Sequence, residues 1–320
     1  MANVEEQALV PVAARQEVVA TSHPQWNLDA IVSELRLSRE VTHRIRRPGP
    51  IRRTPSREAL VKIMNGLSAA LFPTHYGQRE FVAESIDYFV GNELNGALVA
   101  LVEQIRRSLS FTSSDGIGDD ELLREAWSIS SDFAATLPSI RGLLVSDLRA
   151  AFDGDPAATN YPEILIGYPG MTAIIYHRLA HPLHRLGATF LARVISDIAH
   201  SATGIDIHPA AEIGPSFFID HGTGVVIGET TIIGMRVRLY QAVTLGAKRF
   251  PTDETGALVK GTPRHPIIED DVVIYAGATV LGRITIGKGS TIGGNVWLTH
   301  SVPAGTYVSQ AHARSDSHAD

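Results

Sequence analysis

Aliphatic side chains recur at every sixth position over the C-terminal part of the chain. The regular run consists of Ile268, Ile274, Val280, Ile286, Ile292 and Leu298. An earlier run, with one irregular step, consists of Ile207, Ile213, Ile219, Ile227, Ile233, Leu239 and Leu245. This period fits neither an α-helix nor a simple strand, whose faces repeat about every 3.6 and 2.0 residues. It is typical of a parallel β-helix, in which each hexapeptide forms one flat face and three complete a coil.

The period is broken at two places. The step from Ile219 to Ile227 is eight residues instead of six, and the two extra residues fall within the sequence DHGTG. Leu245 and Ile268 are 23 residues apart, so about 17 residues, 247–264, are expected to leave the coil as a loop. The segment KRFPTDETGALVKGTPRH has the proline, glycine and charge content of an exposed loop. Long loops on a rigid scaffold often carry function.

Upstream of the repeat, the apolar positions between residues 58 and 202 follow helical spacing. Helices are predicted over residues 58–72, 76–108, 121–136, 140–152 and 194–202, with another in GYPGMTAIIYHRLAHPLHRLG. The first 57 residues hold many arginines, no interleaved aromatic residues, and the breaks Pro48 and Pro50. We therefore predict four regions, which are a flexible basic arm (1–57), a helical domain (58–202), the β-helix (203–309) and a disordered tail (310–320).

Composition limits the chemistry. The 320 residues carry a formal net charge of −6, which gives no indication of binding to nucleic acid or to an acidic membrane. There is no cysteine, so a disulfide, a thiolate nucleophile and a cysteine-ligated metal are excluded. The start, MANVEEQALV, lacks the pattern of a signal peptide, and no apolar run is long enough to span a membrane. These features predict a cytoplasmic protein.

The histidine in DHGTG is the strongest candidate for chemistry. The glycines of GTGVVIG do not predict a nucleotide-binding loop, because their spacing is one residue too long for a dinucleotide fingerprint and no helix follows. His221 follows Asp220 at the irregular step, and Asp206 lies 15 residues earlier. An Asp can fix the tautomer of a His so that its other nitrogen acts as a general base. Spacing alone does not show that Asp206 and His221 touch, and a structural role for His221 is the alternative.

Metal binding is the competing use of the histidines. Those in or near the β-helix are His208, His221, His265 and His300. No paired spacing such as HxxxH occurs among them, and we expect no metal cofactor. A second set shares one helical stripe and is interpreted as exposed or interface histidines; it consists of His177, His181 and His184.

Five motifs, taken together and in order, resemble those of the serine O-acetyltransferases, a family of hexapeptide-repeat acyltransferases. They are DGDPAA (153–158), DIHPAAEIG (206–214), IDHGTGVVIGET (219–230), VTLGA (243–247) and RHP (264–266). The match covers about residues 147–307, half of the chain. The implied fold class is α+β, with an N-terminal all-α domain, used for oligomerisation and part of the serine site, before a left-handed parallel β-helix.

The resemblance implies an enzyme that transfers acetyl from acetyl-CoA to L-serine, giving O-acetyl-L-serine and CoA, the first step of cysteine biosynthesis. His221 would be the general base and Asp206 would orient it. The serine oxygen would attack the thioester directly, and protonated His221 would return its proton to the CoA sulfur. Neither a metal nor an acyl-enzyme is required, which suits a chain without cysteine.

The resemblance also implies the binding residues. Asp155 and Asp220 would hold the serine ammonium group, and Arg264, helped by His265, would hold its carboxylate, because a zwitterion needs both kinds of partner. Acetyl-CoA would lie in the groove between two prisms, that is, between the three-sided β-helices of two chains. Its pantetheine arm would run against backbone near Gly246, Ala247, Ala276 and Gly294.

The implied assembly is a homotrimer or a dimer of trimers, with L-cysteine as a feedback inhibitor at the serine site. Three features depart from the best-known members. The loop 247–264 is longer, and so is the N-terminal arm, which puts the contact between trimers in doubt. The chain ends in SDSHAD, whereas members that dock into O-acetylserine sulfhydrylase typically end in isoleucine. We therefore expect that complex to be weak or absent.

Two other functions are open. A related O-acetyltransferase would act on another hydroxyl, for example on a sugar, but a sugar does not need the clamp formed by Asp155, Asp220 and Arg264. A non-catalytic β-helix scaffold would not need His221 and Asp206.

Overall fold

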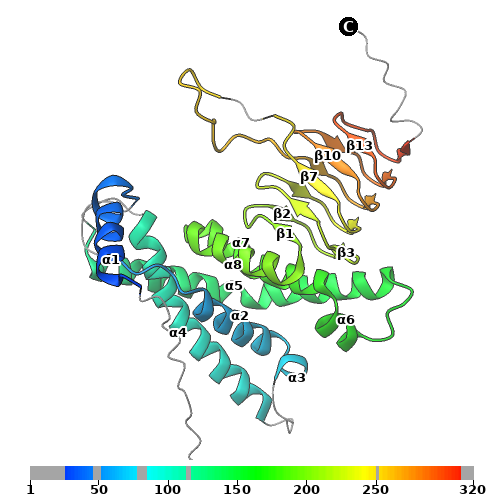
Figure 1. Ribbon diagram of the computed structural model, residues 1–320. Helices are drawn as coiled ribbons and strands as arrows, with labels where there is room; N and C mark the ends of the chain where they lie inside the picture. The colour runs from blue at the N-terminus through cyan, green and yellow to red at the C-terminus, as the bar shows by residue number, and fades with distance from the viewer. Residues whose placement is uncertain (1–25, 46–51, 78–84, 113–116, 250–251, 311–320) are drawn as a thin grey trace, which may run out of the picture. The chain divides into compact units, whose positions relative to one another are not determined.

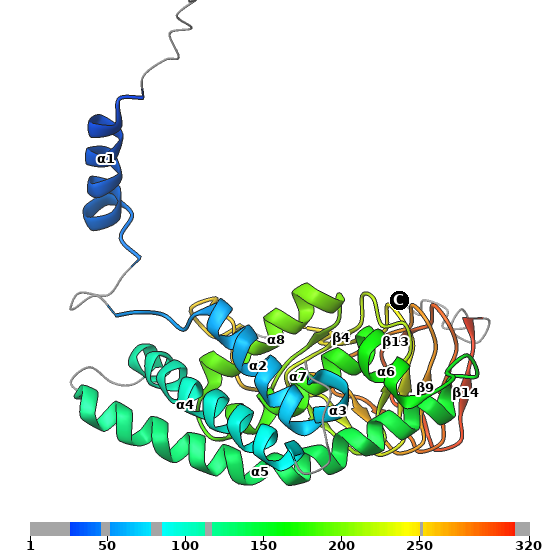
Figure 2. The ribbon, with the colours of Figure 1, turned by 90° about the horizontal axis from the view of Figure 1, so that it is seen from below.

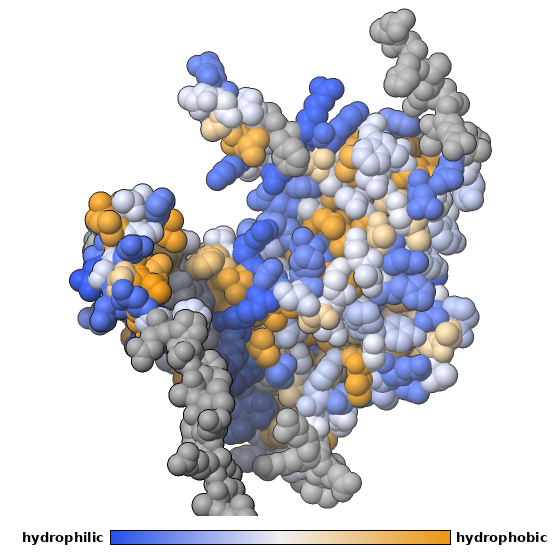
Figure 3. Space-filling view, viewed as in Figure 1, coloured by the Kyte–Doolittle hydropathy of each residue, from blue (hydrophilic) through white to orange (hydrophobic). Residues whose placement is uncertain are grey.

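The computed structural model describes residues 26–45, 52–77, 85–112, 117–249 and 252–310, and the chain divides into two compact units, 1–51 and 52–320. The first unit contains α1 (Leu28–Leu37) and a π-helical turn, η1 (Ser38–Thr42). Asn27 begins α1, because its side chain accepts a hydrogen bond from the backbone N–H of Ala30. None of the residues of α1 is buried, and Figure 3 shows apolar side chains on its surface. The predicted flexible arm therefore contains a helix.

The second unit begins with helices. These are α2 (Arg57–Leu71), α3 (Pro73–Tyr76), α4 (Ile86–Thr112), α5 (Asp119–Gly154), α6 (Tyr161–Gly167), α7 (Pro169–Arg185) and α8 (Thr189–Thr203). Figure 2 shows α5 running from the side of α4 to the base of the β-helix. None of the helices in the described ranges is long and apolar enough to cross a membrane.

The predicted separation of two helices, 121–136 and 140–152, is wrong. The structure has one helix, α5, which continues through Pro138. Proline removes one helical hydrogen bond and usually kinks or ends a helix. Here Leu137, Ile140 and Leu144 form one buried stripe on both sides of the proline, and their packing keeps the helix continuous.

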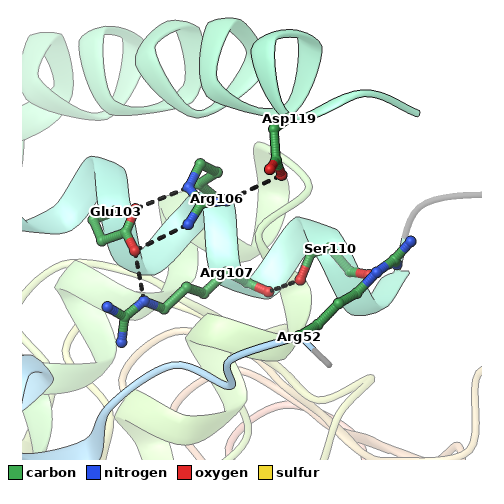
Figure 4. Close-up of polar contacts among 6 residues, drawn as sticks. All are labelled: Arg52, Glu103, Arg106, Arg107, Ser110 and Asp119. Carbon is green, nitrogen blue, oxygen red and sulfur yellow. Dashed lines mark hydrogen bonds and ion pairs between the residues drawn. The ribbon is translucent and has the colours of Figure 1, made fainter. Parts of the chain in front are cut away.

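Polar contacts around α4 tie the neighbouring segments to it (Figure 4). Glu103 accepts hydrogen bonds from Arg106 and from Arg107, and Arg106 also reaches Asp119 at the start of α5 at 3.3 Å. The hydrogen bond from Arg106 is the largest cause that lowers the pKa of Glu103 to about 2. The segment before α2 is held by Arg52, which donates to the carbonyl oxygen of Ser110. The helices thus form one packed base for the β-helix.

The C-terminal part is a left-handed parallel β-helix whose short strands stack in three sheets (Figure 1). The first sheet, with order β1-β4-β7-β10-β13, contains Asp206–Ile207, Val226–Ile227, Thr244–Gly246, Thr279–Leu281 and Trp297–Leu298. The second, with order β2-β5-β8-β11, contains Glu212–Ile213, Ile232–Ile233, Ile267–Ile268 and Thr285–Ile286. The third, with order β3-β6-β9-β12-β14, contains Phe218–Ile219, Arg238–Leu239, Val273–Ile274, Thr291–Ile292 and Tyr307–Val308.

The strand register confirms both predicted breaks. Ile227 pairs with Leu245, 18 positions on, as three hexapeptides require. Ile207 pairs with Ile227, 20 positions on, so the coil that contains DHGTG is two residues longer. Leu245 pairs with Val280, 35 positions on, so the 17 additional residues leave the coil without shifting the register. The repeated aliphatic side chains stack along the inside of the prism, and all of them except the half-buried Ile213 are buried.

A buried ion pair joins the helices to the first coil. Arg178 on α7 donates to both carboxylate oxygens of Asp147 on α5, at 3.0 and 3.1 Å, and also to the carbonyl oxygen of Gly214 at 2.6 Å. Asp147 in turn accepts a hydrogen bond of 2.9 Å from the backbone N–H of Phe217. The side chains of Asp147 and Arg178 are only 0 and 5% exposed. These contacts hold α5 and α7 against the segment that leads into β3, and the candidate site follows β3.

Candidate active site

The irregular corner after β3 displays His221 to solvent. His221 has a φ of 57°, in the left-handed region, and Gly222 follows with a φ of 89°. A side chain at Gly222 would come 2.4 Å from the Cδ1 atom of Ile205, so only glycine fits this turn. The imidazole of His221 is 71% exposed, while the carboxylate of Asp220 beside it is 14% exposed. The Nε2 and Oδ1 atoms of this pair are 3.8 Å apart, which is an ion-pair distance rather than a hydrogen bond.

A cavity of about 260 Å³ brings Asp155 to this corner. Its lining includes Asp155, Asp220 and His221 together with the start of α7. Asp155 directly follows α5, and one of its oxygens accepts a hydrogen bond of 2.8 Å from the backbone N–H of Ala157. The cavity is smaller than pockets for drug-sized ligands, and two carboxylates beside an imidazole suit a small molecule with a cationic group.

Tyr168 was missed by the sequence analysis. Its hydroxyl donates a hydrogen bond of 2.5 Å to the second oxygen of Asp155, from the position just before α7. This bond is the largest cause that lowers the pKa of Asp155 and raises the pKa of Tyr168 to about 12. Asp155 is therefore held as a carboxylate facing the cavity. The sequence did offer a signal for this position, because the Pro-Gly pair in GYPGM marks the start of a helix directly after Tyr168.

Asp206 lies on β1, one coil below the corner. It is in register with Val226, and its backbone N–H donates to the carbonyl oxygen of Val225. Among the described residues, no hydrogen bond links Asp206 to His221. The pairing of these two side chains stays a prediction.

Arg264 and His265 lie at a different corner of the prism, between the first and second sheets. Arg264 pairs with Glu229 at 2.5 Å, and the backbone N–H groups of Arg264 and His265 both donate to the hydroxyl of Thr230. The ring of His265 lies over Gly228, where a Cβ atom would come 2.0 Å from the imidazole. One chain thus keeps Arg264 and His265 apart from the corner that carries Asp155, Asp220 and His221.

The residues predicted for acetyl-CoA divide in the same way. Gly246 ends β7 and Ala247 begins the long loop, so both belong to the corner of Arg264. Ala276 and Gly294 stack on each other at the corner of His221, two and three coils above it, since a Cβ atom on Gly294 would lie 3.2 Å from the carbonyl oxygen of Ala276.

Two histidines of the β-helix, His208 after β1 and His265 before β8, are held neutral. Burial is the main cause that lowers the pKa of His208 to about 4, and burial with the charge of Arg264 does the same for His265. In both rings Nδ1 accepts a hydrogen bond of 3.0 Å from a backbone N–H, of Ala210 and of Thr230. The proton of each neutral ring is therefore on Nε2.

These lowered pKa values predict that the protein becomes less stable as the pH is lowered. Between about pH 6.5 and pH 4 the unfolded chain binds protons on these rings and the folded protein does not. The contribution of these two rings to the free energy of unfolding is therefore fully present above about pH 6.5 and decreases as the pH falls towards 4. Urea midpoints at pH 7 and pH 5 measure this loss. His208→Asn keeps an acceptor for the N–H of Ala210 but does not titrate, so it should reduce the slope; an unchanged slope would contradict the contribution of His208.

The histidine stripe on α7 was interpreted wrongly for one member. His177 is buried, 3% exposed, and burial lowers its pKa well below the ordinary value. His181 is half-buried and its Nδ1 atom lies 2.8 Å from the carbonyl oxygen of Pro209. The stripe packs against other residues because α7 faces α5, α8 and the first coil. Across the described residues, no three His, Asp or Glu side chains come together as a group that could hold a metal ion.

Comparisons with known proteins agree on one kind of enzyme. The family model described as bacterial transferase hexapeptide (six repeats) matches residues 265–300. A plasmid-encoded serine acetyltransferase of Synechococcus elongatus is 55% identical over 314 residues, which cover 97% of both chains. A serine acetyltransferase of Bacillus licheniformis is 51% identical over 161 residues, which cover 50% of this chain and 70% of that relative.

Solved structures show the same similarity. Serine acetyltransferase 1 of Entamoeba histolytica, in complex with L-cysteine, has a TM-score of 0.68 and 36% identity, covering 86% of this chain and 94% of that chain. A serine acetyltransferase of Neisseria gonorrhoeae, in complex with serine, has a TM-score of 0.51 and 28% identity, covering 78% of this chain and 94% of that chain.

Proposed function

Because the chain belongs to the serine acetyltransferase family and is an acyltransferase, we propose that it transfers the acetyl group of acetyl-CoA to the hydroxyl of L-serine, giving O-acetyl-L-serine and CoA for cysteine biosynthesis. The observation that carries this proposal is the cavity in which Asp155 and Asp220 lie beside His221. Two carboxylates can hold an ammonium group there, next to an imidazole that can accept the hydroxyl proton.

In the proposed reaction His221 acts as the general base. A serine hydroxyl is a poor nucleophile at neutral pH, so removal of its proton by the imidazole lets the oxygen attack the thioester carbonyl. The imidazolium then gives the proton to the departing CoA sulfur. Asp206 is proposed to orient the ring. No acyl-enzyme forms, because the serine oxygen attacks acetyl-CoA directly.

We propose that the complete site forms between two copies of the chain. A zwitterionic substrate also needs a cation for its carboxylate, and Arg264 with His265 lies at another corner of the same prism. A head-to-tail ring places one corner of each prism against a different corner of the next. We therefore infer a homotrimer, alone or as a dimer of trimers. Acetyl-CoA would lie between adjacent prisms, where the two groups of predicted glycine and alanine residues face each other.

Mixing two inactive variants tests this arrangement. His221→Ala disables one corner and Arg264→Ala disables the other. After dissociation and reassembly at equal amounts, about a quarter of the interfaces join an intact corner of each kind and should recover activity. The separately reassembled variants are the controls. A mixture that stays as inactive as either variant, although heteromers form, would place the whole site within one chain.

The acceptor is tested by thiol release from acetyl-CoA with L-serine and with a panel of alcohols. L-serine should be preferred, and esters or amides that block its carboxylate or ammonium group should lose most of the rate, because each leaves charged groups of the protein unpaired. A preference for a sugar hydroxyl would favour a related O-acetyltransferase. Absence of thiol release with every acceptor would favour a non-catalytic scaffold.

Two regulatory properties belong to the proposal. L-cysteine is proposed to compete with serine, since it carries the same ammonium and carboxylate groups, and one similar structure contains bound L-cysteine. Inhibition that is not competitive with serine would contradict this. The second property is that a complex with O-acetylserine sulfhydrylase is expected to be weak or absent; residues 311–320, on which this expectation depends, lie outside the described part. Submicromolar binding of the sulfhydrylase would contradict that expectation.

A further inference from the structure

A second cavity, of about 460 Å³, lies between the C-terminal part of α5 and the first two coils of the β-helix. It shares no lining residue with the cavity at His221. Three arginines line it, Arg149 from α5 and Arg236 and Arg238 from the second coil. Asp153 is the one carboxylate of the lining. The cavity therefore carries a surplus of positive charge.

The partners of the arginines differ. Arg236 has a carboxylate partner, since its Nε and one terminal nitrogen donate to the two oxygens of Asp271 at 2.6 and 3.0 Å. Arg238 packs its guanidinium 5.4 Å from the centre of the Phe218 ring, and its hydrogen bond to the hydroxyl of Tyr240 is long, 3.5 Å. Across the described ranges, neither Arg149 nor Arg238 has a carboxylate partner within ion-pair distance. Two guanidinium groups in one cavity thus have no ion-pair partner, and Asp153 is the one carboxylate of the lining that offsets their charge.

The walls of this cavity are fixed. The hydroxyl oxygen of Ser146 accepts a hydrogen bond of 3.0 Å from the backbone N–H of Ser216, beside the buried Asp147 and its bond to Phe217. The lack of a side chain at Gly154 leaves room for the guanidinium group of Arg238, because a Cβ atom at Gly154 would lie 2.3 Å from a guanidinium nitrogen. Within the described part of the chain, the hydroxyl group of Ser216 makes no hydrogen bond. A donor is therefore available beside the two cations.

We propose that this cavity binds a tetrahedral oxyanion, phosphate or sulfate, held by the guanidinium groups of Arg149 and Arg238 and by the hydroxyl of Ser216. Guanidinium groups present paired N–H donors that match the oxygens of such anions, and Arg149 and Arg238 outweigh the single carboxylate of Asp153 in the lining. The cavity is larger than the anion, so it also accommodates the phosphate of a small ester. A free anion and a phosphate ester present the same oxyanion chemistry, and titration with both kinds of ligand distinguishes them.

Occupancy should affect the neighbouring acceptor cavity. Gly154 of this cavity precedes Asp155 in the chain, and Phe218 lies two residues before Asp220. The hydrogen bond from Tyr168 is the largest cause of the lowered pKa of Asp155, and the positive charge of Arg238 is a smaller one. An anion on Arg238 would offset this charge and so reduce its repulsion of an ammonium group at Asp155. The expected result is a lower KM for L-serine; this consequence rests on the proposed function, whereas anion binding does not.

Calorimetric titration of the full chain tests the binding directly. The probes are inorganic phosphate, inorganic sulfate and glycerol 3-phosphate, each against sodium chloride at matched ionic strength. We expect saturable binding of one anion per chain, weakened about tenfold or more by Arg149→Gln and further by Arg149→Gln with Arg238→Gln. Arg149 is exposed on α5, so its variant should fold normally. The matched control is Arg124→Gln, which removes the same charge from an exposed position of α5 outside the cavity.

The three probes separate the outcomes. Binding of inorganic phosphate or sulfate that depends on Arg149 supports a site for the free anion, and binding of glycerol 3-phosphate alone supports a site for an ester. The proposal is overturned if no probe binds saturably, or if Arg149→Gln binds as tightly as Arg124→Gln. Because this measurement does not need acetyl transfer, its failure and the failure of the proposed function are distinguishable.

Discussion

Replacing His221 by alanine is expected to lower kcat for acetyl transfer to L-serine by about 10²–10⁴-fold, the usual contribution of a general base. The ring is exposed at a left-handed corner and makes no hydrogen bond within the described residues, so its removal should leave the fold intact. KM for acetyl-CoA should change little, because in the proposed reaction the imidazole moves protons during the chemical step and does not hold acetyl-CoA before it. Steady-state kinetics with both substrates measure the effect.

His200→Ala is the matched control for this prediction. His200 is an exposed histidine in the last turn of α8, outside the candidate site, and its replacement removes the same ring. Its kcat should equal that of the unchanged protein. A His221→Ala protein with full activity would exclude the proposed mechanism.

Breaking the buried pair of Asp147 and Arg178 is expected to cost about 3–5 kcal/mol of folding free energy. In Asp147→Asn the amide oxygen can still accept from the N–H of Phe217, so the change removes mainly the negative charge. Arg178 would then be a buried cation, 5% exposed, with only carbonyl oxygens as partners. Urea unfolding at fixed protein concentration measures the loss.

Two further variants identify the cause. Replacing both residues, Asp147→Leu with Arg178→Met, should recover part of the stability, because no unpaired charge stays buried. The surface pair of Glu58 and Lys62, with side chains 80 and 75% exposed, is the control, and Glu58→Gln should leave stability nearly unchanged, because exposed ion pairs contribute little. An Asp147→Asn protein as stable as Glu58→Gln would show that the buried pair does not hold α5 and α7 to the prism.

The β-helix could be predicted because its signal is repeated many times. An aliphatic residue occupies each inward-facing position from Ile207 to Leu298, and three hexapeptides are enough to form one coil. The register even contains contacts that the sequence analysis did not extract. The loop adds 17 residues to the 18 of a coil, so positions 35 apart are neighbours, and this offset relates Glu229 to Arg264 and Thr230 to His265.

The rest of the site depends on contacts without a period. Tyr168 reaches Asp155 from the start of another helix, and Asp147 meets Arg178 across two helices. Neither pair leaves a trace in spacing or composition, since any of several polar residues could have met there. The continuity of α5 through Pro138 was missed for a related reason, because packing outweighed the local preference. The division of the predicted site residues between two corners follows from which face of the prism each one occupies.

The long loop is inserted without any change in the register on either side of it. Leu245 and Val280 pair as neighbours although 35 residues separate them, and the next strand, β8, still joins its sheet beside β5. The two ends of the loop are therefore held as close together as those of an ordinary corner, whatever lies between them. The entropy cost of such a closed loop grows only slowly with its length. This corner is consequently a graft point, where segments of different length can be exchanged in evolution or by design while the prism below keeps its stacking.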